Sequence, residues 1–141
     1  MQIEPGWIKG KGLTTSLKLG GFWTNKAPDK FHLEVVYDGV VSIQGLKIGI
    51  DGEVTEFQPT GTMTSHDYIP GVHNSVASIP GHSESSRRFV IPLEYVRRMT
   101  GGKRVIIQAS LGGEYVEGNF SFNQPNFAKP AFVKVLAQIR G

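Results

Sequence analysis

Cysteine is absent from this chain of 141 residues. Disulfide bonds, thiolate nucleophiles and cysteine-ligated zinc or iron–sulfur sites are therefore excluded. No uninterrupted apolar run approaches the ~20 residues that a membrane-spanning helix needs. The N-terminal segment MQIEPGWIKGKG has no apolar stretch of the kind that a signal peptide carries. We expect any export leader to lie outside this sequence.

The chain also has little excess of positive over negative charge. Fifteen Lys and Arg against twelve Asp and Glu give a formal net charge of +3, which is small for a domain that neutralises phosphates. This balance argues against nucleic acid as a partner. Hydrophobic residues make up 39% of the chain and charged residues 19%, a globular composition, and the length fits one domain at 1–141.

Apolar and polar residues alternate with a period of two along much of the chain, which predicts β-strands. The pattern is clearest in FHLEVVY at 31–37 and returns in SIQGLKIGI at 42–50 and EVTEF at 53–57. Asp-Gly pairs, a frequent turn signal, lie at 38–39 and 51–52 between these segments. We therefore expect the three segments to form an antiparallel meander.

The next stretch, QPTGTMTSHDYIPGVHNSVASIPGHSESS at 58–86, has little periodicity and is rich in Gly, Pro, Ser and His. It is longer than an ordinary connection, which is typical of functional or mobile loops. We expect a long loop excursion at 58–86, in which TMTSHDYI is the best candidate for a short strand.

The stretch SRRFVIPLEYVRRMTGGKRVIIQASLGG at 86–113 predicts a strand, a short helix and a second strand. Pro92 suits the first turn of a helix, where its missing N–H costs nothing. Apolar residues at 93, 96 and 99 give that helix an inward face, and Gly101 suits the left-handed position that ends a helix. The Gly pair at 112–113 then turns the chain into a last strand, YVEGNFSF.

The C-terminal segment from Pro130 predicts an amphipathic helix, with apolar residues at helical spacing at 132, 135, 136 and 139. About seven strands with turns between most of them favour a mainly β fold. We expect an antiparallel β-sandwich of immunoglobulin-like general shape, with one short connecting helix and the C-terminal helix. The alternative is an α+β sheet in which the helix after Pro92 crosses between parallel strands.

Histidines gather in the 58–86 stretch and raise the question of a metal site. His66, His73 and His82, with Asp67, offer imidazole and carboxylate ligands suited to zinc or another divalent ion. Their spacing matches no standard ligand pattern, so solvated loop residues are the simpler interpretation. No cofactor-binding motif is present, and we expect no cofactor.

GHSES at 81–85 is one glycine short of the G-x-S-x-G turn that exposes a nucleophilic serine. Its context is also reversed, because a loop leads into a strand where that turn needs a strand leading into a helix. A hydrolase that uses Ser83 with His66 and Asp67 is therefore only an alternative, and no residue is predicted to be catalytic. Acidic residues form no facing pair of the kind that glycoside hydrolysis needs.

Two further groups of residues are candidates for binding. The arginine pairs at 87–88 and 97–98 could hold an anion, but neighbouring residues in a strand point to opposite faces, so we interpret them as surface residues. Phe22 and Trp23, in a glycine-flanked segment taken as a loop, and Tyr68 could stack on a sugar or anchor a protein. The competing interpretation is that Trp23 plugs one end of the core.

We therefore hypothesise a non-enzymatic binding or interaction module, with a protein or carbohydrate partner. Its cysteine-free, glycine-rich β character favours a bacterial envelope or secreted setting, periplasmic or extracellular. The alternative is a small hydrolase or a metal-binding protein that uses the 58–86 stretch. A free strand edge, or a swapped N-terminal strand hinged at Gly20 and Gly21, would also allow a homo-oligomer.

Overall fold

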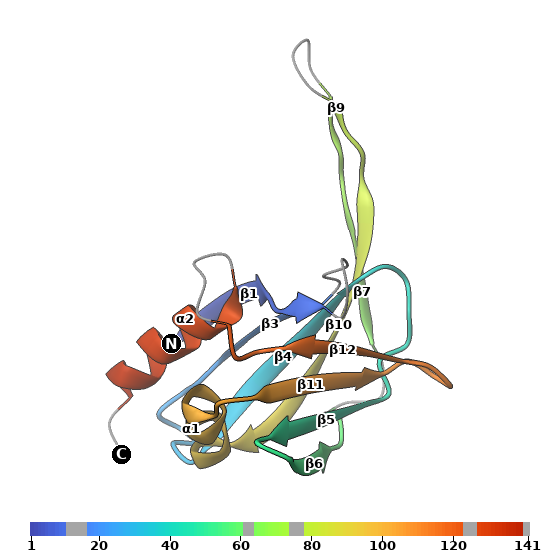
Figure 1. Ribbon diagram of the computed structural model, residues 1–141. Helices are drawn as coiled ribbons and strands as arrows, with labels where there is room; N and C mark the ends of the chain where they lie inside the picture. Colours follow the sequence, from blue (N-terminus) through green and yellow to red (C-terminus); the bar gives the residue numbers. More distant parts are fainter. Residues whose placement is uncertain (11–16, 61–63, 74–77, 123–126, 140–141) are drawn as a thin grey trace.

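A computed structural model describes residues 1–10, 17–60, 64–73, 78–122 and 127–139 of the chain. Two antiparallel five-stranded sheets face each other, and two helices lie at their margins (Figure 1). This is the mainly β, sandwich-like architecture with two helices that the strand pattern predicts, within one small domain.

The first sheet, called sheet A, has the strand order β1-β3-β4-β10-β7. Its strands are β1 (Gln2–Trp7), β3 (Leu17–Phe22), β4 (Lys30–Asp38), β10 (His82–Pro92) and β7 (Ser65–Ile69). Sheet B has the order β2-β12-β11-β5-β6. Its strands are β2 (Lys9–Gly10), β12 (Tyr115–Asn119), β11 (Val105–Ser110), β5 (Gly45–Ile50) and β6 (Glu53–Phe57). A third, two-stranded sheet pairs β8 (Val72–His73) with β9 (Ser78–Ile79).

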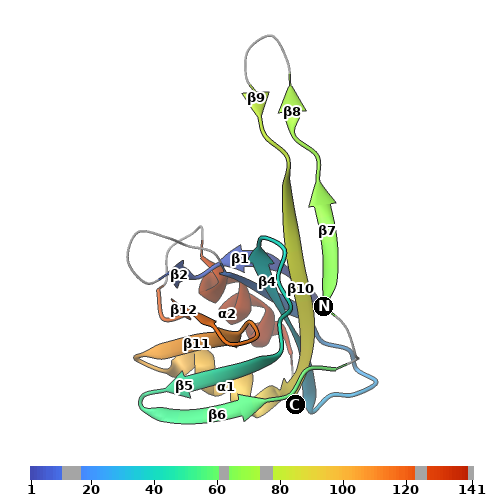
Figure 2. The ribbon, with the colours of Figure 1, turned by 90° about the vertical axis from the view of Figure 1, so that its right-hand side faces the viewer.

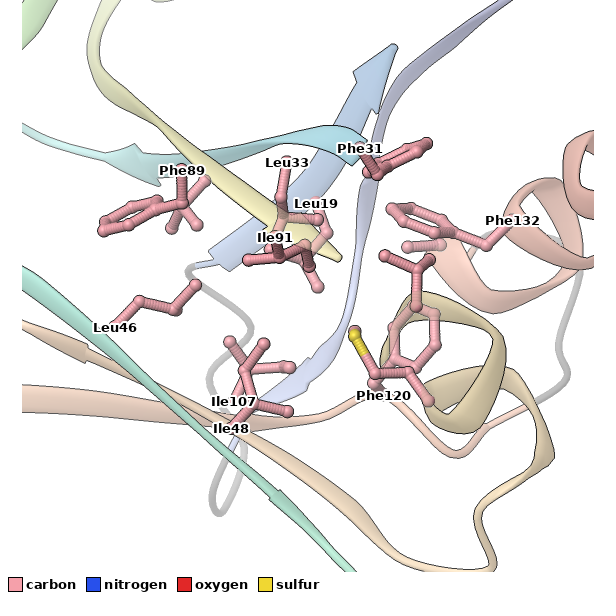
Figure 3. Close-up of a cluster of buried hydrophobic side chains, with 14 of the residues drawn as sticks. Leu19, Phe31, Leu33, Leu46, Ile48, Phe89, Ile91, Ile107, Phe120 and Phe132 are labelled. Carbon is pink, nitrogen blue, oxygen red and sulfur yellow. The ribbon is translucent and has the colours of Figure 1, made fainter. Parts of the chain in front are cut away.

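The core lies between the two sheets because each sheet turns its alternate apolar side chains inward. Figure 3 shows Leu33, Phe89 and Ile91 of sheet A opposite Ile48 and Ile107 of sheet B. All five side chains are completely buried. The inward faces that the period-two pattern predicts for 31–37 and 42–50 are therefore confirmed at Leu33 and Ile48.

Helix α1 (Leu93–Gly101) connects β10 of sheet A to β11 of sheet B. The predicted short helix after Pro92 is thus confirmed, but it joins the two sheets and is not a crossover between parallel strands of one sheet. The left-handed end predicted at Gly101 is wrong, because Gly101 is the last residue of the helix and has no positive φ, and the following C-cap residue Gly102 has an ordinary φ of −73°. Val105 and Ile50 crowd Gly102, which explains why a glycine is needed there.

Helix α2 (Ala128–Gln138) begins two positions before the predicted start at Pro130. Its Phe132 is fully buried and meets the ring of Phe31 from sheet A at a centroid distance of 5.7 Å. On the other side it meets the ring of Phe120, which follows sheet B, at 5.2 Å (Figure 3). One aromatic side chain of the helix therefore closes the core between the two sheets.

The predicted meander is wrong, because β4 belongs to sheet A while β5 and β6 belong to sheet B. Only the second Asp-Gly pair makes a hairpin: Asp51 and Gly52 both have positive φ, 51° and 95°, as a tight two-residue turn requires. The segment 39–44 instead carries the chain from one sheet to the other. An Asp-Gly pair in the sequence therefore does not show by itself whether the chain forms a hairpin or crosses to the other sheet.

Strands β1 and β3 contradict the expectation that Gly20 and Gly21 form a hinge and that Phe22 lies in a loop. A side chain at Gly20 would collide with the backbone of Ile3 and Pro5 in β1, and Gly21 has a φ of 151°. These glycines allow two strands to approach closely, which is a regular use of glycine within a sheet.

The described residues of the 58–86 stretch are mostly β structure and not the expected long loop. Strand β7 pairs with the first half of β10, and β8 pairs with β9. The pairs Ser65–Ser86, Ile69–His82, Val72–Ile79 and His73–Ser78 share one register, so the residues form a single two-stranded ribbon. We call this ribbon, residues 65–73 and 78–86, the arm. Figures 1 and 2 show that it projects well clear of the sandwich body.

We predict that Phe132→Ala lowers the free energy of unfolding by about 3–5 kcal/mol, because it removes the ring that bridges the two sheets and leaves a cavity. Val133→Ala, at an exposed position of the same helix, is the matched control and should change stability by less than about 0.5 kcal/mol. Urea denaturation measures both. An equal effect of the two substitutions would contradict the closing role of Phe132.

Candidate interaction surface

Among the side chains that the structure describes in the arm, Ser85 at the root is the buried one. Every residue of β7 is exposed, and Tyr68 and Ile69 leave 67% and 38% of their surface accessible. Along the common register, Pro70 lies opposite Gly81 and Gly71 lies opposite Pro80. Proline has no N–H to donate, so the ladder is interrupted at this point and the distal part beyond it is joined more weakly to the root.

The root of the arm is tied to the body by Ser85, which is fully buried. Its hydroxyl donates to the carbonyl oxygen of Gly39 at 2.7 Å and accepts from the N–H of Val41 at 3.0 Å. Nδ1 of His66, its cross-strand neighbour, lies 2.9 Å from the same oxygen. Because the hydroxyl proton is committed to Gly39, His66 must act as the donor to Ser85.

Two more side chains hold the segment that crosses between the sheets. Thr64 receives the N–H of Ile43 at 2.9 Å, and Arg87 donates to the carbonyl oxygen of Ile43 at 2.7 Å. Ile43 itself is fully buried. Buried backbone groups need such partners, so Ser85, Thr64 and Arg87 together fix the crossing segment to the arm's root.

The same geometry disagrees with the hydrolase alternative. His66 is bonded to Ser85 and not to Ser83, whose cross-strand neighbour is Tyr68. Asp67 is adjacent to His66 in a strand and therefore lies on the opposite face. Ser85, the serine that does contact the histidine, has no solvent-accessible surface and has already given its proton to a carbonyl. Neither serine has the exposed, base-activated hydroxyl that a nucleophile needs.

Two of the predicted metal ligands, His66 and His82, do not converge. His82 is paired with Ile69, three positions from His66, so the two histidines lie on opposite faces of the ribbon. The side chain of His73 lies outside the described residues. Among the described side chains there is no group of three or more His, Asp or Glu arranged to hold a metal ion.

Two of the aromatic residues predicted to bind a partner, Phe22 and Trp23, make contacts within the chain. Phe22 stacks on His32 at 4.4 Å with an interplanar angle of 6°, and the guanidinium of Arg88 lies 5.2 Å from its ring. Trp23 is half-buried, packs against the core and donates its indole N–H to the carbonyl of Pro28 at 3.0 Å. These contacts favour the plug interpretation of Trp23.

Tyr68 is the predicted aromatic residue that remains exposed, and it lies on the arm. Seven positions of β10 separate its partner Ser83 from Val90, which is paired with the row that contains Phe22. At the rise of a strand this is a distance of about 23 Å. Tyr68 therefore does not form one binding surface with Phe22 and Trp23.

The arginines have partners of their own. Arg97 donates to the carbonyl oxygens of Leu136 and Ile139, where helix α2 ends. Arg98 lies 3.3 Å from Glu53, and Arg88 lies 3.7 Å from Glu34. These contacts within the chain agree with the interpretation of Arg88, Arg97 and Arg98 as parts of the protein's own surface.

Charge is divided unevenly between arm and body. The 58–86 stretch contains Asp67 and Glu84 but no Lys or Arg, so all fifteen Lys and Arg and ten of the twelve Asp and Glu belong to the rest of the chain. The formal charges are therefore −2 for the stretch and +5 for the remainder. The sequence alone shows this division of charge. Only the structure shows that the acidic part includes a projecting arm.

No protein-family model, curated protein or solved structure matches this chain. In the described part of the chain, neither helix is long and apolar enough to cross a membrane. The geometry of the arm and of its root is therefore the basis for a functional proposal.

We predict that Ser85→Ala lowers the free energy of unfolding by about 1–3 kcal/mol, because the backbone groups of Gly39 and Val41 lose their buried partner. Ser83→Ala, two positions along the same face of the arm, should change stability by less than about 0.5 kcal/mol. Chemical denaturation with fluorescence detection measures both. A loss of stability in Ser83→Ala equal to that in Ser85→Ala would contradict the assignment.

Proposed function

We propose that this protein is a non-enzymatic interaction module whose arm binds a protein partner. The observation that carries the proposal is the arm itself: a two-stranded ribbon, exposed along β7, whose described distal part leaves the body and pairs with no other strand of the described chain. Isolated two-stranded ribbons are marginally stable in water. A projecting ribbon gains its missing contacts from another molecule.

The way the arm is anchored supports the same function. Buried hydrogen bonds fix its root to the segment between the sheets, whereas the opposed Pro-Gly pairs interrupt the ladder further out. A rigid root sets the direction in which the arm points, and the interruption lets the distal part adjust its angle. Both properties suit a binding element that is presented by a stable scaffold.

The arm also offers the usual means of strand-based recognition. Extended partners bind exposed strand edges through backbone hydrogen bonds, while side chains such as Tyr68 provide specificity. The hydrolase and metal-binding alternatives have less support, because the serine that contacts histidine is buried and His66 and His82 lie on opposite faces. The bacterial envelope or secreted setting stays a prediction from composition.

A photo-crosslinking amino acid at position 68 tests the proposal in cells that produce the protein naturally. We expect a discrete adduct from position 68 and none from position 133, an exposed valine on helix α2 that serves as the control. Gel mobility and mass spectrometry identify the adduct, whether it contains another protein or a second copy. Equal, diffuse labelling from the two positions would contradict a binding role for the arm.

A further inference from the structure

We propose that the outer face of sheet B holds a second binding site, which takes a neutral oligosaccharide. The site is a hollow of about 480 Å³, within the range of about 300–1,000 Å³ that small-molecule sites occupy. Its lining residues belong to the segment 44–58 and to the hairpin 108–115, and none belongs to the arm. Figure 2 shows the arm projecting away from the strands of sheet B, and the inference does not rest on the arm's proposed function.

Alternation along the strands places the hollow on the solvent side of sheet B. Leu46 of β5 and Ala109 of β11 are buried in the core. Their neighbours in the strands, Gly45, Gln108 and Ser110, therefore point outward. The hollow extends from β6 across β5 and β11 to β12, which are three strand spacings or about 14 Å. This width suits a short chain of sugar rings better than a single ring.

Gly45 forms part of the floor of the hollow, and the fold does not require a glycine there. Its φ is not positive, and an added Cβ would meet only the Cβ of Ser110, at an ordinary 3.8 Å. At Gly20 and Gly102, by contrast, the nearest atom would lie at 2.6 and 2.7 Å. Glycine weakens a strand, and within strands it often marks a place where a ligand approaches the backbone. Room for a ligand therefore explains the bare backbone at Gly45.

Amide side chains supply the hydrogen-bonding groups of the hollow. Gln44 and Gln108 both line it. Each amide offers an acceptor oxygen and two N–H donors, and within the described chain neither amide has a hydrogen-bond partner. A sugar hydroxyl is both a donor and an acceptor, so it can pair with either end of an amide. The two glutamines are therefore suited to bind neighbouring hydroxyl groups.

Tyr115 supplies an apolar surface at one end of the hollow. It follows the turn residue Gly113, pairs with Ser110 and leaves 60% of its surface accessible. An exposed tyrosine presents a flat apolar ring together with a polar hydroxyl group. A sugar ring has the matching shape, with C–H groups on its faces and hydroxyl groups around its edge. The ring of Tyr115 and the amides together thus suit both parts of a sugar.

The charges of the hollow favour a neutral ligand. Lys47 lies 3.9 Å from Glu56, which also accepts a hydrogen bond from Gln58 at 3.1 Å. The other charged lining residue is Glu114, so the lining holds one Lys, two Glu and no Arg. Binding of phosphate, sulfate or carboxylate groups relies on Arg and Lys. The hollow has no excess of cations for an acidic polysaccharide or a nucleic acid.

An array of immobilised oligosaccharides with neutral, acidic and amine-bearing chains tests the class of ligand. We expect neutral chains to retain the labelled protein. Titration calorimetry with the neutral chain that gives the strongest signal then measures the Kd. Retention by no neutral chain, or stronger retention by charged chains, would overturn the inference.

Two substitutions in β5 test whether the hollow is the site. Gly45→Val fills the floor and should weaken binding by about tenfold or more. Gly49→Val is the matched control, because it adds the same side chain on the same face but outside the hollow, where a Cβ has an ordinary contact of 3.5 Å with Val54. It should change the Kd by less than about twofold. Valine favours strands, so urea denaturation should show no loss of stability in either variant. Equal weakening of binding by both would contradict the assignment of the hollow.

Two tyrosine variants separate this site from the arm. Tyr115→Ala should weaken oligosaccharide binding by about tenfold, whereas Tyr68→Ala, at the exposed tyrosine of the arm, should leave it unchanged. Loss of binding in Tyr68→Ala alone would place the sugar on the arm and overturn the inference. The crosslink at position 68 measures the arm independently. An adduct without oligosaccharide binding would overturn only this inference, and binding without an adduct would contradict only the proposed function.

Discussion

The fold depends on one constraint, namely that the chain must cross from sheet A to sheet B after β4 and bury one residue of the crossing segment, Ile43, in the core. The crossing segment buries Ile43 completely, and a buried backbone without hydrogen-bond partners is strongly unfavourable. Side chains in the arm's root and directly beside it supply those partners: Ser85 serves Gly39 and Val41, while the neighbouring Thr64 and Arg87 serve Ile43. Closing of the body and docking of the arm's root therefore stabilise each other.

This dependence divides the molecule into parts of different stability. The root is locked into the core, and helix α2 is held by Phe132 on one side and by Arg97 at its end. Beyond the opposed Pro-Gly pairs the ribbon has no such support in the described chain. Local opening should therefore begin in the distal arm and stop at the root, because exposed ribbons with few buried contacts open most easily.

Much of the fold was predictable from the sequence because the central strands obey a simple period. Leu33, Ile48 and Ile107 lie where the alternation of apolar residues places them, and both helices occur where apolar spacing predicts them. Pairing was harder to predict. Asp38 and Asp51 each precede a glycine, yet only the second makes a hairpin, because the first leads into a crossing whose partners lie more than twenty residues away in sequence.

The candidate site was less predictable than the core. The sequence identifies Tyr68 as a binding aromatic residue and groups the histidines, but the strand register separates His66 from His82 and buries Ser85. Proline and glycine made 58–86 resemble a loop because each is rare inside strands. Only the register shows that the two Pro-Gly pairs face each other, so they interrupt one continuous ribbon and do not end it.

That continuous register also constrains how the arm can change length in related sequences. Partners in the arm have residue numbers with a constant sum, from Ser65 and Ser86 to His73 and Ser78. A residue inserted in one strand alone would turn every more distal side chain of that strand to the other face. Matched insertions in both strands keep the register, and those of two residues in each strand, about 7 Å at a time, also keep every distal side chain on its face. Relatives whose arms present the same faces should therefore differ in length by such steps.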